Sequence, residues 1–365
     1  MRAEPVRSPL TSPTTDDAGE TRLVELIRAE IDARGPITFA RFMERALYEP
    51  GLGYYATNSA RTTREGDFLT AQELHPIFGQ TVARQVEEMW QRMGRPSDFT
   101  VREYGAGRGS LGGALPTGLR YEAIEFDQPR PATPFVGVVL ANEFLDALPM
   151  HRVVGTAQGL RELGVGWSGG AFANVQMELS DDRLAAWFDS HLISLQVGQI
   201  AEVNLAMLDW LAEIGRDLER GFALILDYGV PAAELYEPSN PQRVGGTLRA
   251  FRGQHVSSNI LGAVGHQDLT AHVDLDALED GARDNGLDVL GRVRQAEFLL
   301  GSGLDEAYVA ARGEADQDWD AALNLRAAVR RLLDPSTLGG YAVVILGKGV
   351  EREPPLRGLA AKRAL

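Results

Sequence analysis

Short apolar runs with the length of buried strands alternate with helical segments from residue 99 onward, and this alternation constrains the fold most strongly. The strand-like runs occupy residues 99–103, 121–125, 136–141, 222–228, 287–294 and 341–346. Helical spacing of apolar residues recurs in residues 183–192, 203–220, 275–285 and 317–333. Strands that alternate with helices favour a mostly parallel sheet that is covered on both faces. The sequence therefore predicts an α/β fold.

The remaining segments have a different character. Residues 1–20 are rich in Ser, Thr, Pro and Asp, so we expect a disordered lead there. Helical spacing in residues 23–31, 39–47 and 76–93, with a Gly-, Thr- and Tyr-rich loop at 49–72, predicts a helical cap and lid loop over 21–98. A sheet domain over 99–349, with a β-rich and helical insertion at about 150–202, and a tail over 350–365 complete the predicted organisation.

Charge and composition exclude several classes of function. The chain has 36 basic and 51 acidic residues, and its net charge of −15 argues against general binding of nucleic acid. The absence of Cys excludes disulfides, thiolate metal sites and a cysteine nucleophile. No apolar run approaches the roughly 18 residues of a membrane span, and residues 1–20 lack the apolar core of a secretory signal. We therefore expect a cytoplasmic protein without membrane insertion.

A glycine-rich loop follows the first predicted strand. Glu103 ends this strand, and Gly105, Gly107 and Gly109 come directly after it, a pattern that predicts a glycine turn leading into a helix. Such glycines allow backbone N–H groups to approach a ligand where a helix begins, although a purely structural turn has the same pattern. Ser110 stands where the dinucleotide-binding fingerprint requires its third glycine, so a nicotinamide cofactor fits poorly.

Acidic and amide side chains end the next two predicted strands. Glu125 ends the strand after the glycine loop, where a carboxylate can hold a ribose diol; the alternative is a solvated strand end. Asn142, Glu143 and Asp146 follow the third strand, so we expect them at the carboxyl edge of the sheet. Two carboxylates and an amide suit a cationic substrate such as a guanidinium. A helix N-terminus capped by Asn142 is the structural alternative, and both interpretations are compatible.

Six short segments form a consistent series along the chain: YEPGLGYY at 48–55, GDFLTAQE at 66–73, NEFLDALP at 142–149, LDYG at 226–229, DLTAHVD at 268–274 and QAEFL at 295–299. In content and order they resemble the signature blocks of the MidA-like family of S-adenosylmethionine-dependent methyltransferases. This family is related to a mitochondrial protein arginine methyltransferase that assists complex I assembly. The resemblance spans roughly residues 36–349.

The resemblance implies a Rossmann-like, seven-stranded methyltransferase sheet with an N-terminal helical cap and an inserted segment. It implies that S-adenosylmethionine is the cofactor and that a protein arginine is the acceptor. The residues are assigned as follows: Glu103, Gly105, Gly107 and Gly109 hold the methionine part, Glu125 holds the ribose, Asn142 and Glu143 face the methyl sulfonium, and Gly66, Asp67, Thr70 and Glu73 belong to the lid loop.

Several other residues are candidates for the acceptor side of the site. Carboxylates can orient a guanidinium through paired hydrogen bonds, and Glu143 could share this task with Asp146, Glu73 or Glu202. Asp227 and Tyr228 end a strand and line the same cleft in one interpretation, and form a strand-end turn in the other. We expect His272 to order a loop near the substrate, together with Asp268, and we expect no metal.

One departure from the family pattern concerns the edge of the sheet. Only ten residues separate Glu125 from Val136, too few for the helix and strand that a full methyltransferase sheet places there. The sequence therefore predicts a missing edge strand and an incomplete adenine pocket. Asp127 could substitute for the acidic contact to adenine that the missing unit would supply. Two alternatives remain beside the protein-arginine enzyme: a binding or assembly factor with little activity, and a small-molecule methyltransferase.

Overall fold

A computed structural model of the chain describes residues 20–57, 71–107, 109, 111–125, 131, 133–252, 255–314 and 318–360. The predictions for residues 1–19, for the lid residues Gly66, Asp67 and Thr70, and for Asp127 lie outside these described residues. Glu20 does not belong to a disordered lead as predicted. Its carboxylate accepts a hydrogen bond from the backbone N–H of Arg22 at 3.3 Å and caps the first helix.

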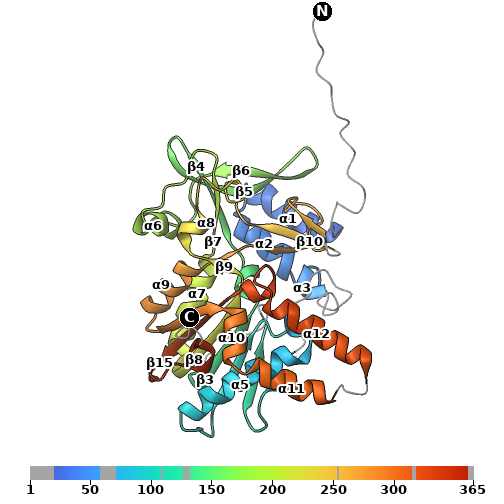
Figure 1. The fold of residues 1–365 in the computed structure, drawn as a ribbon. Helices are drawn as coiled ribbons and strands as arrows, with labels where there is room; N and C mark the ends of the chain where they lie inside the picture. Colours follow the sequence, from blue (N-terminus) through green and yellow to red (C-terminus); the bar gives the residue numbers. More distant parts are fainter. Residues whose placement is uncertain are drawn as a thin grey trace, which may run out of the picture.

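A central sheet carries the site. Within the described residues it has six strands in the order β14-β15-β8-β3-β1-β2 (Figure 1). Strand β15 runs antiparallel to both neighbours, whereas β8, β3, β1 and β2 are parallel, so the mostly parallel α/β sheet is confirmed. The strands are β1 (Thr100–Tyr104), β2 (Arg120–Ile124), β3 (Phe135–Asn142), β8 (Leu218–Asp227), β14 (Asp288–Arg294) and β15 (Ala342–Lys348).

Strand β2 forms one edge of this sheet. The next strand along the chain, β3, pairs with the opposite side of β1. In the part of the chain that the structure describes, the sheet thus has one strand fewer than the family resemblance implies, as the short spacing after Glu125 predicts.

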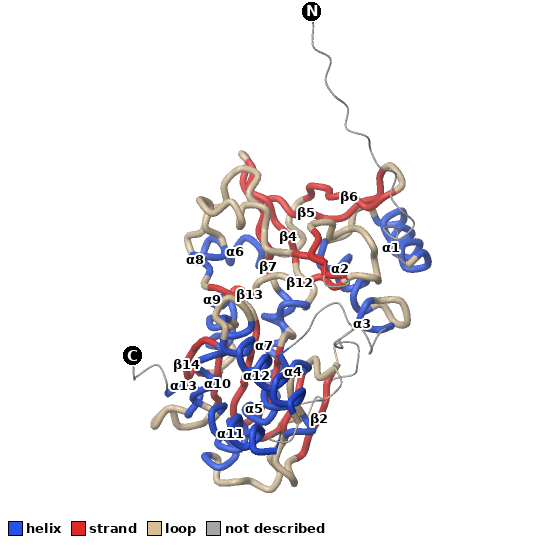
Figure 2. The backbone as a smooth tube through the Cα atoms, turned by 45° about the vertical axis from the view of Figure 1, so that its right-hand side comes forward, coloured by secondary structure: helices blue, strands red, loops and turns tan. Residues whose placement is uncertain are grey.

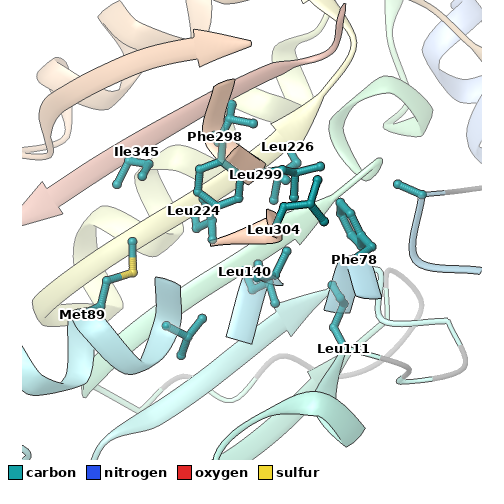
Figure 3. Packing of buried hydrophobic residues seen from close by; sticks show 14 of the residues in the cluster. Phe78, Met89, Leu111, Leu140, Leu224, Leu226, Phe298, Leu299, Leu304 and Ile345 are labelled. Carbon is teal, nitrogen blue, oxygen red and sulfur yellow. The ribbon is translucent and has the colours of Figure 1, made fainter. Parts of the chain in front are cut away.

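Alternate residues of the central strands face opposite layers of helices, as a sheet buried on both faces requires. Leu140 of β3 packs in one core with α5 (Pro76–Arg92), α10 (Gln295–Gly301), α11 (Leu304–Glu314) and α12 (Trp319–Leu333). Figure 3 shows Leu140 in this core with Phe78 of α5 and Phe298 of α10. On the other face, Val139 packs with α7 (Leu205–Asp217) and α9 (Leu275–Asp284). The apolar periodicity did not predict α10 and α11.

A second, antiparallel sheet lies beside the N-terminal helices (Figures 1 and 2). Its strand order is β6-β5-β4-β7, and it occupies the segment for which the sequence predicts an insertion. Phe42 contacts Phe172 of this sheet with ring centroids 5.3 Å apart. The elements are α1 (Thr21–Arg34), α2 (Phe39–Tyr48), β4 (His151–Thr156), β5 (Gly159–Ser168), β6 (Ala171–Met177), α6 (Arg183–Ser190) and β7 (Ile200–Val203).

Short elements complete the described structure, and most of them were not predicted. Strands β10, β11 and β12 form a small antiparallel sheet, and β9 pairs with β13. These elements are α3 (Tyr54–Thr57), α4 (Ala71–Leu74), β9 (Gly229–Val230), α8 (Ala232–Leu235), β10 (Arg249–Arg252), β11 (His255–Ser257), β12 (Asp268–Thr270), β13 (Val273–Asp274) and α13 (Arg357–Ala360). No helix in the described ranges combines the length and apolar character needed to cross a membrane.

The described part of the predicted tail packs against α5. Leu356 and Leu359 are buried in the same core as α5 and α10. The backbone N–H of Gly358 donates to Oε1 of the buried Gln85 at 2.9 Å. Residues up to 360 therefore form part of the folded core.

Two glycines allow the central strands to approach closely. Gly137 of β3 pairs in register with Thr100 of β1 and with Gly221 of β8. A Cβ at Gly137 would lie 1.9 Å from the carbonyl oxygen of Thr100, and a Cβ at Gly221 would lie 1.8 Å from that of Gly137. Their φ angles of 154° and 146° are also unfavourable for side chains.

We predict that Gly137→Ala lowers the free energy of unfolding by about 3 kcal/mol or more, because the methyl group meets backbone atoms that cannot move independently. Gly313→Ala is the matched control. Gly313 lies in α11, and a Cβ there would have no described atom within 4 Å. Alanine there should be neutral or stabilising. Urea denaturation followed by circular dichroism measures the free energy of unfolding of both variants. Equal denaturation midpoints for the two variants would contradict the packing argument.

Candidate functional site

The glycine loop after β1 takes a conformation that only glycine adopts readily. Gly105, Gly107 and Gly109 have φ angles of 66°, 55° and 68°. A Cβ at Gly105 would lie 2.9 Å from Cδ2 of Phe144, whereas a Cβ at Gly107 would have no described atom within 4 Å. The loop is therefore closely packed against Phe144 at Gly105 and open at Gly107. A ligand could lie in the open space at Gly107.

The predicted helix after this loop is wrong for the described residues. The described helical structure there is a short 3₁₀ turn, Gly112–Ala114. Gly113, Pro116 and Gly118 follow in quick succession, and glycine and proline disfavour an α-helix. The described loop therefore presents a glycine turn to a ligand, without the N-terminus of an α-helix.

Glu103 occupies the end of β1 and is almost completely buried, with 1% of its surface exposed. The hydroxyl of Tyr121 donates a hydrogen bond to its Oε2 at 2.6 Å. Burial raises the pKa of Glu103 to about 7, with a further contribution from the charge of Glu125, although the bond from Tyr121 opposes the shift. A buried acid at this place is suited to bind an ammonium group of a ligand.

Glu125 follows β2 and closes the glycine loop from the neighbouring strand. Its Oε1 accepts a hydrogen bond from the backbone N–H of Gly107 at 2.8 Å. The parallel strands β1 and β2 thus bring Glu103 and Glu125 to one edge beside the open glycine loop. This donor and acceptor set fits the amino acid and ribose parts of S-adenosylmethionine.

Asn142 ends β3 and Glu143 follows it, and both carry acceptor oxygens without partners among the described residues. Asn142 Oδ1 and Glu143 Oε2 are buried and have no hydrogen-bond partner among the described residues. Oε1 of Glu143 accepts the backbone N–H of Ala71 at 3.0 Å, which brings α4 and its Glu73 beside the strand end. Glu143 has a φ of 50°, a left-handed conformation that is uncommon outside glycine and is typical of functional sites.

Burial and neighbouring carboxylates shift the acidity of this group. Burial raises the pKa of Glu143 to about 8, and the charges of Asp146 and Glu73 add to the effect, while the hydrogen bonds from Ala71 and Asn142 oppose it. Glu143 therefore holds a proton at neutral pH unless a cation lies next to it.

Asp146 lies in the 3₁₀ turn Leu145–Ala147, three residues after Glu143. Its side chain is 4% exposed, and Oδ1 has no hydrogen-bond partner in the described structure. Burial raises the pKa of Asp146 well above its ordinary value, and the charges of Asp227 and Asp268 raise it further. The helix that the alternative interpretation placed here is wrong, because the described turn is only three residues long.

Asp227 holds the backbone of this turn. Its Oδ2 accepts the N–H groups of Phe144 at 3.2 Å and Leu145 at 2.8 Å, and its Oδ1 accepts the N–H of Tyr228 at 2.9 Å. Burial raises the pKa of Asp227 to about 7, against the effect of these bonds. The structure thus uses Asp227 in a strand-end turn, and Tyr228 has a buried hydroxyl with no hydrogen-bond partner among the described residues.

Glu202 and His272, two further predicted site residues, make their hydrogen bonds with residues outside the Glu143 and Asp146 cluster. Glu202 belongs to β7 of the second sheet, where Oε2 accepts the backbone N–H of Thr247 at 2.8 Å and Oε1 lies 3.7 Å from Nε of Arg152. His272 has Nδ1 3.1 Å from Nη1 of Arg243. Burial lowers the pKa of His272 to about 4, and the charge of Arg243 adds to this. Both residues line a small pocket that Leu145 also borders, and the ring of His272 lies 5.4 Å from that of Tyr228.

Sequence reasoning missed a group of aromatic residues beside Asp146. The Tyr48 hydroxyl donates to the carbonyl oxygen of Ala147 at 2.9 Å, and the Tyr55 hydroxyl donates to Oδ1 of Asp268 at 2.8 Å. Asp268 thus pairs with Tyr55, where the sequence paired it with His272. The three tyrosines of the segment 48–55 were the available signal.

Comparisons with known proteins indicate the same family of enzymes. The model of a family described as S-adenosyl-L-methionine-dependent methyltransferases matches residues 119–293. A protein from Burkholderia thailandensis, described as a candidate methyltransferase and crystallised with S-adenosyl-homocysteine, is 30% identical with a TM-score of 0.81, covering 92% of this chain and 94% of that one. A native structure from the same organism is 29% identical with a TM-score of 0.79, covering 93% and 94%.

Curated relatives extend the similarity to mitochondrial proteins. The protein arginine methyltransferase NDUFAF7 of Danio rerio is 29% identical, over 78% of this chain and 77% of its own length. The human protein of the same name is 24% identical, over 78% and 74%. The cytoplasmic location expected from the sequence stays a prediction. With the family model and the matching structures, the fold and the site geometry show that this chain belongs to the MidA-like family of S-adenosylmethionine-dependent methyltransferases.

Proposed function

We propose that this methyltransferase acts on the guanidinium group of a protein arginine. The observation that carries the proposal is a cluster of buried acceptor oxygens: Asn142 Oδ1, Glu143 Oε2 and Asp146 Oδ1 have no hydrogen-bond partner among the described residues. A buried acceptor without a donor costs about 1–3 kcal/mol. A guanidinium offers five N–H donors in a planar fork and no acceptor, so it matches this set.

The cofactor is proposed to lie along the edge formed by β1 and β2. Glu103 would bind the amino group, the glycine loop would lie under the methionine part, and Glu125 would take the ribose hydroxyls. When bound, the cofactor supplies a methyl group on a positively charged sulfur. Methyl transfer is an in-line displacement, so orientation of the acceptor and exclusion of water account for much of the rate.

The acceptor nitrogen must lose a proton while it gains the methyl group. In the proposal, the carboxylates of Glu143 and Asp146 hold the guanidinium and concentrate its charge on the nitrogens they bind, so that one nitrogen is left to attack. Glu143 Oε2 would take the proton that the acceptor nitrogen loses when it receives the methyl group. A raised pKa of about 8 makes this carboxylate a suitable base.

The curated relatives support the acceptor class, since they are named protein arginine methyltransferases. One structural feature favours a second candidate function. Strand β2 is the edge of the described sheet, so the adenine side has fewer contacts than a full sheet supplies. A binding or assembly factor with little activity would have this form.

Radiolabelled methyl transfer and calorimetry test these candidates together. The proposal expects S-adenosylmethionine to bind and arginine-containing protein segments to take up label, whereas the same segments with Lys in place of Arg take up none. Absence of cofactor binding even at millimolar concentration would favour the assembly factor. Binding with labelling of a metabolite and of no arginine segment would favour a small-molecule enzyme.

We predict that kcat/KM for an arginine substrate rises with pH up to about 8 and is flat above it. The ionised carboxylate is required, and its fraction grows about tenfold per pH unit below the pKa. kcat should also increase with pH, but with its midpoint at a lower pH than that of kcat/KM. The reason is that a bound guanidinium favours the ionised form of Glu143 and so lowers its pKa. Glu143→Gln should reduce kcat at least about 100-fold and remove the rise near pH 8. A profile that stays unchanged in Glu143→Gln would contradict the assigned base.

We predict that Gly107→Val abolishes binding of S-adenosyl-homocysteine. Valine is strained at a φ of 55°, and its side chain would fill the open space above the loop. Gly113→Ala is the matched control, because its Cβ would have no described neighbour within 4 Å and its φ is not positive. Isothermal titration with S-adenosyl-homocysteine measures the affinity of both variants for this ligand. Unchanged affinity in Gly107→Val would refute the placement of the cofactor.

A further inference from the structure

Two tyrosines from the segment 48–55 stand together at the acceptor side. Tyr48 ends α2 and Tyr55 lies in α3, and their rings are stacked with centroids 5.4 Å apart and an angle of 23°. Gly53 makes the tight return between them possible, since a Cβ there would lie 2.6 Å from the carbonyl oxygen of Leu47. Both tyrosines are partly buried as residues, and the hydrogen bonds described next place them beside the buried carboxylates.

Hydrogen bonds attach this pair to the turn that carries Asp146. Tyr48 donates to the carbonyl oxygen of Ala147, the residue after Asp146, at 2.9 Å. Tyr55 donates to Asp268 Oδ1 at 2.8 Å. Three residues beyond Asp268, the N–H of Ala271 donates to the carbonyl oxygen of Asp146 at 3.1 Å. Tyr48 is therefore connected to the Asp146 turn by one hydrogen bond, and Tyr55 by two, through the segment from Asp268 to Ala271.

The electrostatics of these groups point to a cation. Asp146 and Asp268 are 4% and 6% exposed. Burial raises the pKa of Tyr48 and of Tyr55 well above the ordinary value, and the charges of Asp268 and Asp146 raise both further. Two carboxylates and two aromatic rings thus share one poorly solvated region, where a cation gains both ion-pair and cation–π energy.

We infer that Tyr48, Tyr55 and Asp268 form a specificity wall of the acceptor site, which selects a planar guanidinium side chain over an ammonium. The inference rests on the proposed function and extends it from the reacting oxygens to residues contributed by α2, α3 and β12. Arginine stacks on aromatic faces and is weakly hydrated, whereas the ammonium of lysine is compact and strongly hydrated. An aromatic and acidic wall therefore favours arginine.

Three substitutions separate the parts of this wall. Asp268→Asn keeps the shape and removes the charge, Tyr55→Phe keeps the ring and removes the hydroxyl, and Tyr48→Leu removes a ring. We expect Asp268→Asn to raise KM for an arginine peptide about tenfold or more. Tyr48→Leu should raise it about threefold or more, and Tyr55→Phe should have the smallest effect. The kcat of all three should stay within about twofold, because none of them touches the reacting oxygens.

A buried carboxylate outside the site provides the matched control. Asp217 ends α7, is 4% exposed and pairs with Arg216. Asp217→Asn should leave KM unchanged, which excludes a general effect of removing a buried charge. Affinity for S-adenosyl-homocysteine should be unchanged in every variant. A labelled arginine peptide, titrated with S-adenosyl-homocysteine present, should bind at least about tenfold more tightly than its lysine counterpart, and Tyr48→Leu should narrow this ratio.

The outcomes distinguish the inference from the function on which it rests. If the unchanged protein methylates no arginine substrate, the proposed function fails and the specificity wall fails with it. If it does methylate arginine while Asp268→Asn and Tyr48→Leu keep its KM and its arginine-to-lysine ratio, only the wall is refuted. A purely structural role is indicated, and the wall is also refuted, if the variants lower kcat and the midpoint of thermal unfolding without a selective rise in KM.

Discussion

One buried carboxylate holds the turn that carries the proposed acceptor site. Asp227 at the end of β8 accepts backbone N–H groups of the turn that follows β3, with its shortest bond, 2.8 Å, to Leu145. The two strands are parallel neighbours, so their ends meet at one edge and a single side chain can bridge them. Glu143 precedes this turn and Asp146 lies in it, so the directions of their carboxylates depend on this bridge.

The same edge concentrates carboxylates that water would normally stabilise. Burial of Glu143 and Asp227 raises the pKa of the former to about 8 and that of the latter to about 7. Glu103 at the cofactor end is shifted in the same direction, to a pKa of about 7. A cation placed among such acids restores their ionised forms, which links ligand binding to the charge state of the site. The net negative charge of the whole chain is much less informative about binding of a cation than this local arrangement of buried carboxylates.

Much of the cofactor side could be predicted because it depends on local pattern. A strand that ends in Glu103 and continues into Gly105, Gly107 and Gly109 predicts a tight glycine turn, and the short link after Glu125 leaves no room for another edge strand. The helix expected after the loop was wrong, although Gly113, Pro116 and Gly118 carried the opposing signal. The expectation relied on the pattern of a strand followed by spaced glycines and gave too little weight to the helix propensity of the residues after them.

The sequence by itself determined which residues end the parallel strands, since apolar runs of strand length and the residues after them are local properties. Tertiary structure alone decided which side chains converge. Glu202 belongs to the second sheet and Asp268 to a small strand far along the chain, and their spacing in sequence gives no direction in space. Tyr48 reaches the turn after β3, and Tyr55 reaches Asp268 of β12, only because of tertiary packing. These contacts join residues 99 and 213 positions apart in the chain.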